Sequence, residues 1–124
     1  MRRSIYVVDD EEMVLTVTLQ ILRRMNSDWE VTGFLDPFSA LEAVRAKAPD
    51  AVLTDQRMPG MLGEQLLEQV RVVSPTTIRL LMSGSFVSDK VALITSAHQI
   101  IAKPFEAAEL QDIIQRSFAE QTKP

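Results

Sequence analysis

The sequence predicts an α/β fold, a doubly wound parallel sheet of five strands with five helices. Five apolar runs of strand length alternate with segments of helical periodicity along the 124 residues, as repeated βαβ units require. Three of these runs contain adjacent apolar pairs without polar alternation, Val7-Val8, Val52-Leu53 and Leu80-Leu81, which is typical of strands buried on both faces. Because βαβ connections are right-handed, we expect helices on both faces of the sheet.

The N-terminal segment is predicted to form a strand and an amphipathic helix. Ser4–Val8 is the strand, because it is apolar and rich in β-branched residues. Apolar residues then recur at spacings of three and four, which predicts a helix that ends near Asn26. The expected buried stripe of this helix is Val14, Val17, Ile21, Leu22 and Met25.

A second strand and helix follow. Trp29–Phe34 is predicted to be the strand. Asp36 followed by proline is typical of a helix start, and we expect this helix to bury Leu41, Val44 and Ala48.

The third unit leads directly into a candidate functional residue. Ala51–Thr54 is predicted to be a buried strand that runs into Asp55. The Pro59-Gly60 pair indicates a turn, and a helix up to Ser74 follows. Its apolar positions are Leu66, Leu67, Val70 and Val73.

The remainder of the chain completes the sheet. Thr77–Met82 and Ile100–Ala102 are predicted to be the last two strands, and Val87–Ser96 between them is a weak helical segment of mixed composition. The apolar residues of the final helix are Leu110, Ile113, Ile114 and Phe118.

Five strands suit the flavodoxin-like order 2-1-3-4-5, in which the first and third strands are neighbours at the topological switch point. We expect one domain over residues 1–120, with 121–124 as a tail or the start of a linker.

Composition excludes several classes of function. The 13 Lys and Arg residues against 17 Asp and Glu give a net charge of −4, which argues against direct binding to nucleic acid. The absence of cysteine excludes disulfides, zinc–thiolate sites and thiol catalysis. No apolar stretch approaches the roughly 20 residues that span a bilayer. We therefore expect a cytoplasmic protein without a membrane partner.

Chemically active residues follow the predicted strands at their carboxyl ends. Asp9 and Asp10 follow the first strand, Asp55 the third, Ser83 the fourth and Lys103 the last. Because parallel strands end at the same edge of a sheet, we expect these side chains to gather in one crevice. Clustered carboxylates repel one another, so either some of them take up protons or a hard divalent cation joins them. Mg²⁺ is the natural candidate, because it prefers oxygen ligands.

Each of these residues also has an ordinary structural interpretation. Asp9 and Asp10 are compatible with a helix N-cap, and Asp55 with a solvated loop acid. Ser83 is compatible with a turn, and Lys103 with a solvated surface lysine. In the functional interpretation, Asp55 is a nucleophile toward phosphorus, and Lys103 supplies positive charge to the phosphoryl group. His98 is expected to be a hydrogen-bonded polar residue at a strand start.

Four motifs resemble the signatures of the response-regulator receiver domain of two-component signalling. They are Val7–Glu11, Asp55–Gly63, Met82–Gly84 and Lys103–Phe105. They occur in the order of the family, and the resemblance covers essentially the whole chain.

The resemblance implies a role for each residue. Asp55 would be the phospho-acceptor, and Asp10 and Asp55 would bind Mg²⁺ directly with Asp9 assisting. The roles implied for the other residues are the backbone carbonyl of Arg57 as a metal ligand, Ser83 as the switch hydroxyl and Lys103 as the phosphoryl contact.

The family resemblance also implies a function and partners. The domain would accept a phosphoryl group from a histidine kinase or a phosphotransfer protein and change its output surface. It would be a regulatory domain that catalyses only its own phosphorylation and dephosphorylation. Ala97–Pro104 resembles receivers that are fused to HDOD or HD-GYP output domains, and a homodimer stays open. Receivers often carry an aromatic residue where this chain has Ile100, so the aromatic switch of the family is not expected here.

Three alternatives remain at this point. A phosphohydrolase like the haloacid dehalogenases also uses an aspartate nucleophile, but it requires an acid where this chain has Arg57. A flavodoxin-like nucleotide binder would need a glycine-rich phosphate loop, and the four glycines form none. A phosphate-independent interaction module is the third.

Overall fold

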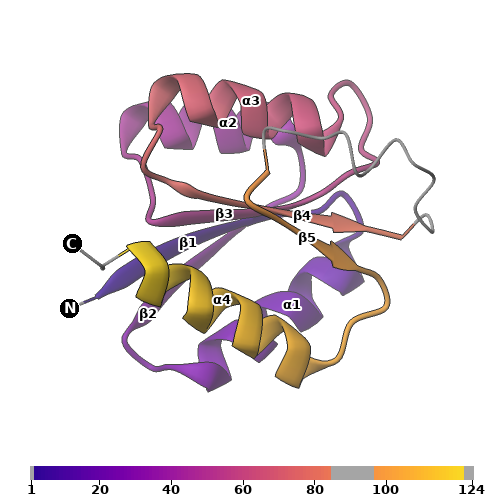
Figure 1. Ribbon diagram of the computed structural model, residues 1–124. Helices are drawn as coiled ribbons and strands as arrows, with labels where there is room; N and C mark the ends of the chain where they lie inside the picture. Colours follow the sequence, from indigo (N-terminus) through magenta and orange to yellow (C-terminus); the bar gives the residue numbers. More distant parts are fainter. Residues whose placement is uncertain (1, 85–96, 122–124) are drawn as a thin grey trace.

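The computed structural model describes residues 2–84 and 97–121. The strands form one parallel sheet in the order β2-β1-β3-β4-β5 (Figure 1), which confirms the predicted order. Their bounds are β1 Arg3–Val8, β2 Trp29–Phe34, β3 Ala51–Asp55, β4 Ile78–Ser83 and β5 Gln99–Ala102.

Helices connect the strands and cover the sheet. Those in the described part of the chain are α1 Glu12–Met25, α2 Pro37–Ala46, α3 Gly63–Val73 and α4 Ala107–Gln121. The weak helix predicted over Val87–Ser96 lies outside the described residues. In Figure 1, α1 and α4 lie on one face of the sheet, and α2 and α3 on the other.

Two apolar clusters, one on each face, fix the sheet between the helices. Alternate residues of β1 point to opposite faces, as the strand period requires: Ile5 and Val7 join the cluster that contains α1 and α4 residues, whereas Val8 joins the other. Both faces are therefore buried, which explains the continuous apolar pairs in the sequence.

The strand register brings the carboxyl ends together. β1 pairs with β3 from Ile5 opposite Ala51 to Val8 opposite Thr54, so Asp9 and Asp55 follow at neighbouring positions. β4 pairs with β5 up to Ser83 opposite Ala102, so Lys103 follows beside Ser83. The predicted site residues therefore emerge at one edge.

The predicted stripe of α1 is wrong at Val17. The buried residues of this helix are Leu15, Thr18 and Leu22, whereas Val17 is 53% exposed. Apolar residues occur around most of this helix, so the spacing alone does not identify the buried face.

The predicted stripe of α2 is wrong at its end. The helix ends at Ala46, and Ala48 is exposed beyond it, because Pro49 follows and disfavours a helical residue before it. The predicted start is confirmed, since the Asp36 carboxylate accepts a hydrogen bond from the Ser39 amide at 2.9 Å.

Candidate functional site

Asp9 and Asp10 lie at the C-terminal end of β1 and differ in exposure. The Asp9 side chain is fully buried, and its Oδ1 accepts a hydrogen bond from the Glu11 amide at 3.0 Å. Asp10 is exposed at the mouth of the crevice. Asp9 is thus held by the protein, and Asp10 is open toward a ligand.

Asp55 is the last residue of β3 and is only 8% exposed. Its Oδ1 accepts a hydrogen bond from the Gln56 amide at 3.0 Å. Carboxylate oxygens of Asp9, Asp10 and Asp55 all lie within 4.8 Å of one another. The predicted convergence of these three acids is confirmed.

Lys103 lies between two of these acids. Its Nζ is 3.0 Å from Asp9 Oδ2 and 3.3 Å from Asp55 Oδ1. Burial by itself lowers the pKa of Lys103, but the hydrogen bond to Asp9 and the charges of Asp55 and Asp9 outweigh burial and raise it. Lys103 is therefore a fixed ammonium in the crevice.

The Asp55 carboxyl has a raised pKa, and burial is the largest cause. Lys103 opposes this shift by favouring the charged form, and the nearby Asp9 adds to it by repulsion. The folded protein therefore disfavours the charged form of Asp55. This charged carboxylate is the form that can act as a nucleophile.

Ser83 and Arg57 lie at the same edge of the sheet as the acids. Ser83 is 4% exposed at the end of β4, and its carbonyl accepts a hydrogen bond from the Lys103 amide at 2.8 Å. Arg57 is exposed in the loop after Asp55. Together with Asp55 and Lys103 it lines a cleft of about 360 Å³. A metal-binding role of the Arg57 carbonyl stays a prediction.

The donor set fits a hard divalent cation. Three carboxylates converge, and the Lys103 ammonium balances only part of their charge. Oxygen donors of this kind suit Mg²⁺, which commonly takes one or two carboxylates and keeps several waters. Asp10 and Asp55 are the more accessible donors, because Asp9 is fully buried.

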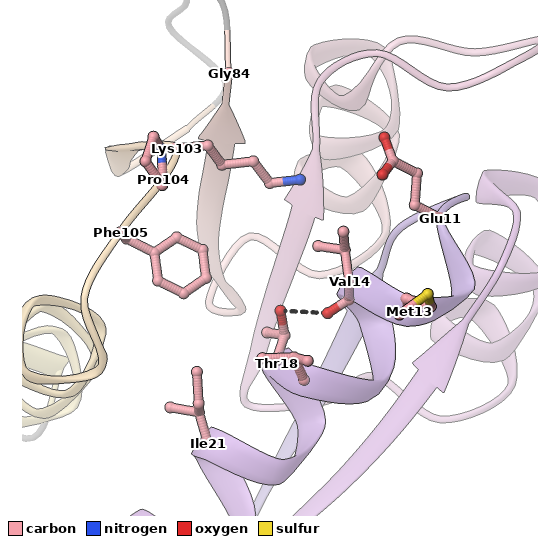
Figure 2. Close-up of a pocket in the computed structure, with 10 residues that line it drawn as sticks. Glu11, Met13, Val14, Thr18, Ile21, Gly84, Lys103, Pro104 and Phe105 are labelled. Carbon is pink, nitrogen blue, oxygen red and sulfur yellow. Dashed lines mark hydrogen bonds between the residues drawn. The ribbon is translucent and has the colours of Figure 1, made fainter.

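An apolar groove adjoins the crevice on the α1 side. Its volume is about 570 Å³, and it runs between α1 and the segment that follows β5. In Figure 2, Val14 of α1 faces Phe105 across the groove and Met13 lies beyond Val14, while the Lys103 side chain extends toward Glu11. Met13 is 83% exposed, so this side of the acid cluster presents an apolar surface.

Sequence reasoning missed the residues that hold the loop after Asp55. The side chain of Gln56 makes two hydrogen bonds with Glu64, and Gly63 lies so close to Asp55 that a Cβ atom there would be 2.2 Å from the Asp55 carbonyl oxygen. Gln56 follows β3 and Glu64 lies in the first turn of α3, so the pair does not lie within one helix or strand and no periodic signal could reveal it. Gly63, the last residue of the second motif, was the available signal for the close approach to Asp55.

The comparisons with known proteins agree with this geometry. A family model described as the response regulator receiver domain matches residues 5–115. The chain belongs to this family. It is thus a domain of a regulatory family in which phosphorylation-dependent signalling is the common function, and no finding favours the three alternatives.

This receiver domain has relatives that are longer proteins. It is 37% identical over 111 residues, 89% of its length, to the DNA-binding response regulator MtrA of Mycolicibacterium paratuberculosis, of which the alignment covers 48%. The chain thus spans about half the length of this curated relative.

Solved structures share its fold. The CheY-like receiver domain protein of Methanospirillum hungatei has a TM-score of 0.90 at 25% identity, with 98% of this chain and 97% of that chain covered. The receiver domain of a sensor histidine kinase from Pseudomonas aeruginosa has a TM-score of 0.85 at 26% identity, with 96% of this chain and 99% of that chain covered. That structure holds a magnesium ion in its active site cleft.

Over residues 2–84 and 97–121 of this receiver domain, every helix is too short or too polar to span a membrane.

Proposed function

We propose that this receiver domain is a Mg²⁺-dependent switch that accepts a phosphoryl group on Asp55 from a histidine kinase or a phosphotransfer protein. The observation that carries the proposal is the convergence of Asp9, Asp10 and Asp55 within 4.8 Å beside the Lys103 ammonium. In this proposal residues 1–120 are the receiver domain, and 121–124 are a tail or the start of a linker.

Asp55 is the nucleophile in this proposal. One carboxylate oxygen forms a bond to phosphorus while the bond from phosphorus to the donor's histidine nitrogen breaks, and the nitrogen keeps the bonding electrons. The raised pKa of Asp55 leaves its carboxylate poorly stabilised in the free protein. A cation bound beside it would stabilise the charged, reactive form.

Asp10, Asp55 and the Arg57 carbonyl would hold Mg²⁺, with Asp9 assisting. The ion supplies positive charge near the phosphoryl oxygens, and phosphoryl transfer depends mainly on such positioning and charge. Lys103 adds a second positive charge, since its Nζ lies 3.3 Å from Asp55 Oδ1 and can turn toward a phosphoryl oxygen. The Ser83 hydroxyl would donate a hydrogen bond to the same group.

The phosphoryl donor must approach Asp55 closely, so its surface has to rest on the rim of the crevice. The apolar groove along α1 is part of that rim, with Met13 83% and Val17 53% exposed. We propose that the phosphohistidine-bearing protein covers this groove. Three further expectations stay predictions. They are a C-terminal output domain of the HDOD or HD-GYP type, a homodimer and a cytoplasmic location. MtrA is a DNA-binding regulator, whereas we expect no direct contact between this domain and nucleic acid.

Labelling with a small acyl phosphate tests the proposal. With Mg²⁺, intact-mass spectrometry should show one added phosphoryl group, which EDTA prevents and Asp55→Asn abolishes. Asp36→Asn, a change at an exposed helix cap, is the matched control and should label normally. Equal labelling of Asp55→Asn and the wild type would refute the assignment.

A further inference from the structure

Gln56, the first residue of the loop after Asp55, makes backbone hydrogen bonds at both ends of this loop. The Gln56 backbone amide lies 3.0 Å from both Asp55 Oδ1 and the Met82 carbonyl oxygen. The Gln56 carbonyl accepts a hydrogen bond from the Gly63 amide at 2.8 Å. The backbone of Gln56 thus ties the acceptor carboxylate to the start of α3.

The side chain of Gln56 also joins the loop to α3, through Glu64. Its Oε1 accepts a hydrogen bond from the Glu64 amide at 2.9 Å, and its Nε2 donates to Glu64 Oε1 at 3.0 Å. We name these two hydrogen bonds the Gln56–Glu64 clamp. One bond satisfies a free amide of the first helical turn, and the other is strengthened by the charge of the carboxylate.

The clamp replaces an ordinary helix cap. Leu62 precedes α3 and has no polar side-chain atom, so it cannot cap the helix. The cap comes instead from the residue directly after Asp55. Hydrogen bonds therefore join the first turn of α3 to the segment that carries Asp55 and the Arg57 carbonyl.

We propose that the Gln56–Glu64 clamp is a positioning device that holds the Asp55–Arg57 segment in its metal-binding conformation. This inference rests on the proposed function, because it assigns the clamp to the same Mg²⁺ site. Without the clamp, the loop has to be ordered when the ion binds, so the affinity for Mg²⁺ falls.

Variants at both ends of the clamp test this inference. Gln56→Leu removes both hydrogen bonds without a change of charge. Glu64→Leu removes the acceptor and the charge, whereas Glu64→Gln removes the same charge and keeps an acceptor for Gln56 Nε2. Isothermal titration with MgCl₂ measures the dissociation constant of each protein, and thermal melts without metal measure the fold.

The expected pattern separates positioning from charge. Gln56→Leu and Glu64→Leu should raise the Mg²⁺ dissociation constant roughly tenfold, as loss of an outer contact typically does, and Glu64→Gln should stay near the wild type. An equal rise in both Glu64 variants would assign the effect to charge and overturn the proposal. Lower melting temperatures with unchanged Mg²⁺ affinity would overturn it too, since they describe a merely structural contact. If the wild type itself binds no Mg²⁺, the proposed function fails instead.

Discussion

The polar groups at the N-terminal and C-terminal ends of the strands are paired in different ways. At the N-terminal end, polar groups are paired locally: the buried Thr77 hydroxyl donates to the Pro49 carbonyl at 2.8 Å, and the Ser4 amide donates to Asp50 at 2.7 Å. At the C-terminal end, three carboxylates share the Lys103 ammonium. At the first end the partners come from the chain itself, whereas at the second three acids face a single ammonium.

A buried arginine shows how complete the N-terminal end is. The Arg79 guanidinium donates to the carbonyls of Pro75 and Thr77, each at 3.1 Å, and the Arg79 amide donates to His98 Nδ1 at 2.9 Å. The prediction that His98 is a hydrogen-bonded residue at a strand start is confirmed. The sheet thus gains stability at the N-terminal end of its strands, where polar groups are paired. At the C-terminal end it keeps uncompensated negative charge that is available to a ligand.

The largest expected effect on stability comes from adding a side-chain atom at the closely packed Gly63, beside the C-terminal end of β3. In Gly63→Ala, the new Cβ would lie 2.2 Å from the Asp55 carbonyl oxygen and 2.8 Å from Leu81, so backbone must shift. We expect a loss of about 3 kcal/mol or more of unfolding free energy, measured by urea denaturation. Gly84→Ala is the matched control, because its nearest neighbour is 3.8 Å away. Equal stability of the two variants would contradict the close approach at Gly63.

Removing the Lys103 ammonium should make the stability of the fold depend more strongly on Mg²⁺. Lys103→Ala leaves the buried Asp9 carboxylate without its ion pair, and we expect a loss of roughly 2–3 kcal/mol in metal-free protein. Mg²⁺ should restore part of this loss, because the ion replaces the missing charge. Lys47→Ala, at an exposed lysine, should change little with or without Mg²⁺. A loss that Mg²⁺ does not reduce would make Lys103 purely structural.

A change at the other end should not respond to metal. Thr77→Val removes hydrogen bonds to the Pro49 carbonyl and the Ser74 hydroxyl, and we expect a loss of about 1–2 kcal/mol. Denaturant melts with and without Mg²⁺ should give the same difference from the wild type. A Mg²⁺-dependent difference would show that the two ends are not independent.

The smallest expected effect is a gain in stability. The pKa of Asp55 is raised, chiefly by burial, so its charge opposes folding, and Asp55→Asn should raise the melting temperature of metal-free protein by a few degrees at pH 7. The gain should be full above the folded pKa of Asp55, shrink as the pH falls through it, and vanish below the unfolded value near 3.9.

Asp36→Asn provides a control of opposite sign. The pKa of Asp36 is lowered, chiefly by the hydrogen bond from the Ser39 amide, so its charge favours folding and its replacement should not stabilise the protein. A stabilising effect of the same size in both variants would contradict the assignment to Asp55.

The sequence predicted the strand order and the convergence of the acids and the lysine, because both depend on local, repeating signals. Parallel strands end at one edge, so the residues after each strand, among them Asp9, Asp55 and Lys103, had to converge. The outward face of α1 could not be predicted, since Val17 and Leu15 are both apolar and only tertiary packing distinguishes them. The Gln56–Glu64 clamp could not be predicted either, because a glutamine and a glutamate eight residues apart meet only once the loop between them has folded.

The central claim, that a divalent cation completes the C-terminal end of the sheet, is tested most directly by the melting temperature under a magnesium titration. A ligand that binds only the folded state stabilises it in proportion to the logarithm of its concentration above the dissociation constant. We predict that Mg²⁺ raises the melting temperature of the wild type and has a much smaller effect on Asp55→Asn. An unchanged melting temperature of the wild type in millimolar Mg²⁺, or an equal rise in both proteins, would contradict the claim.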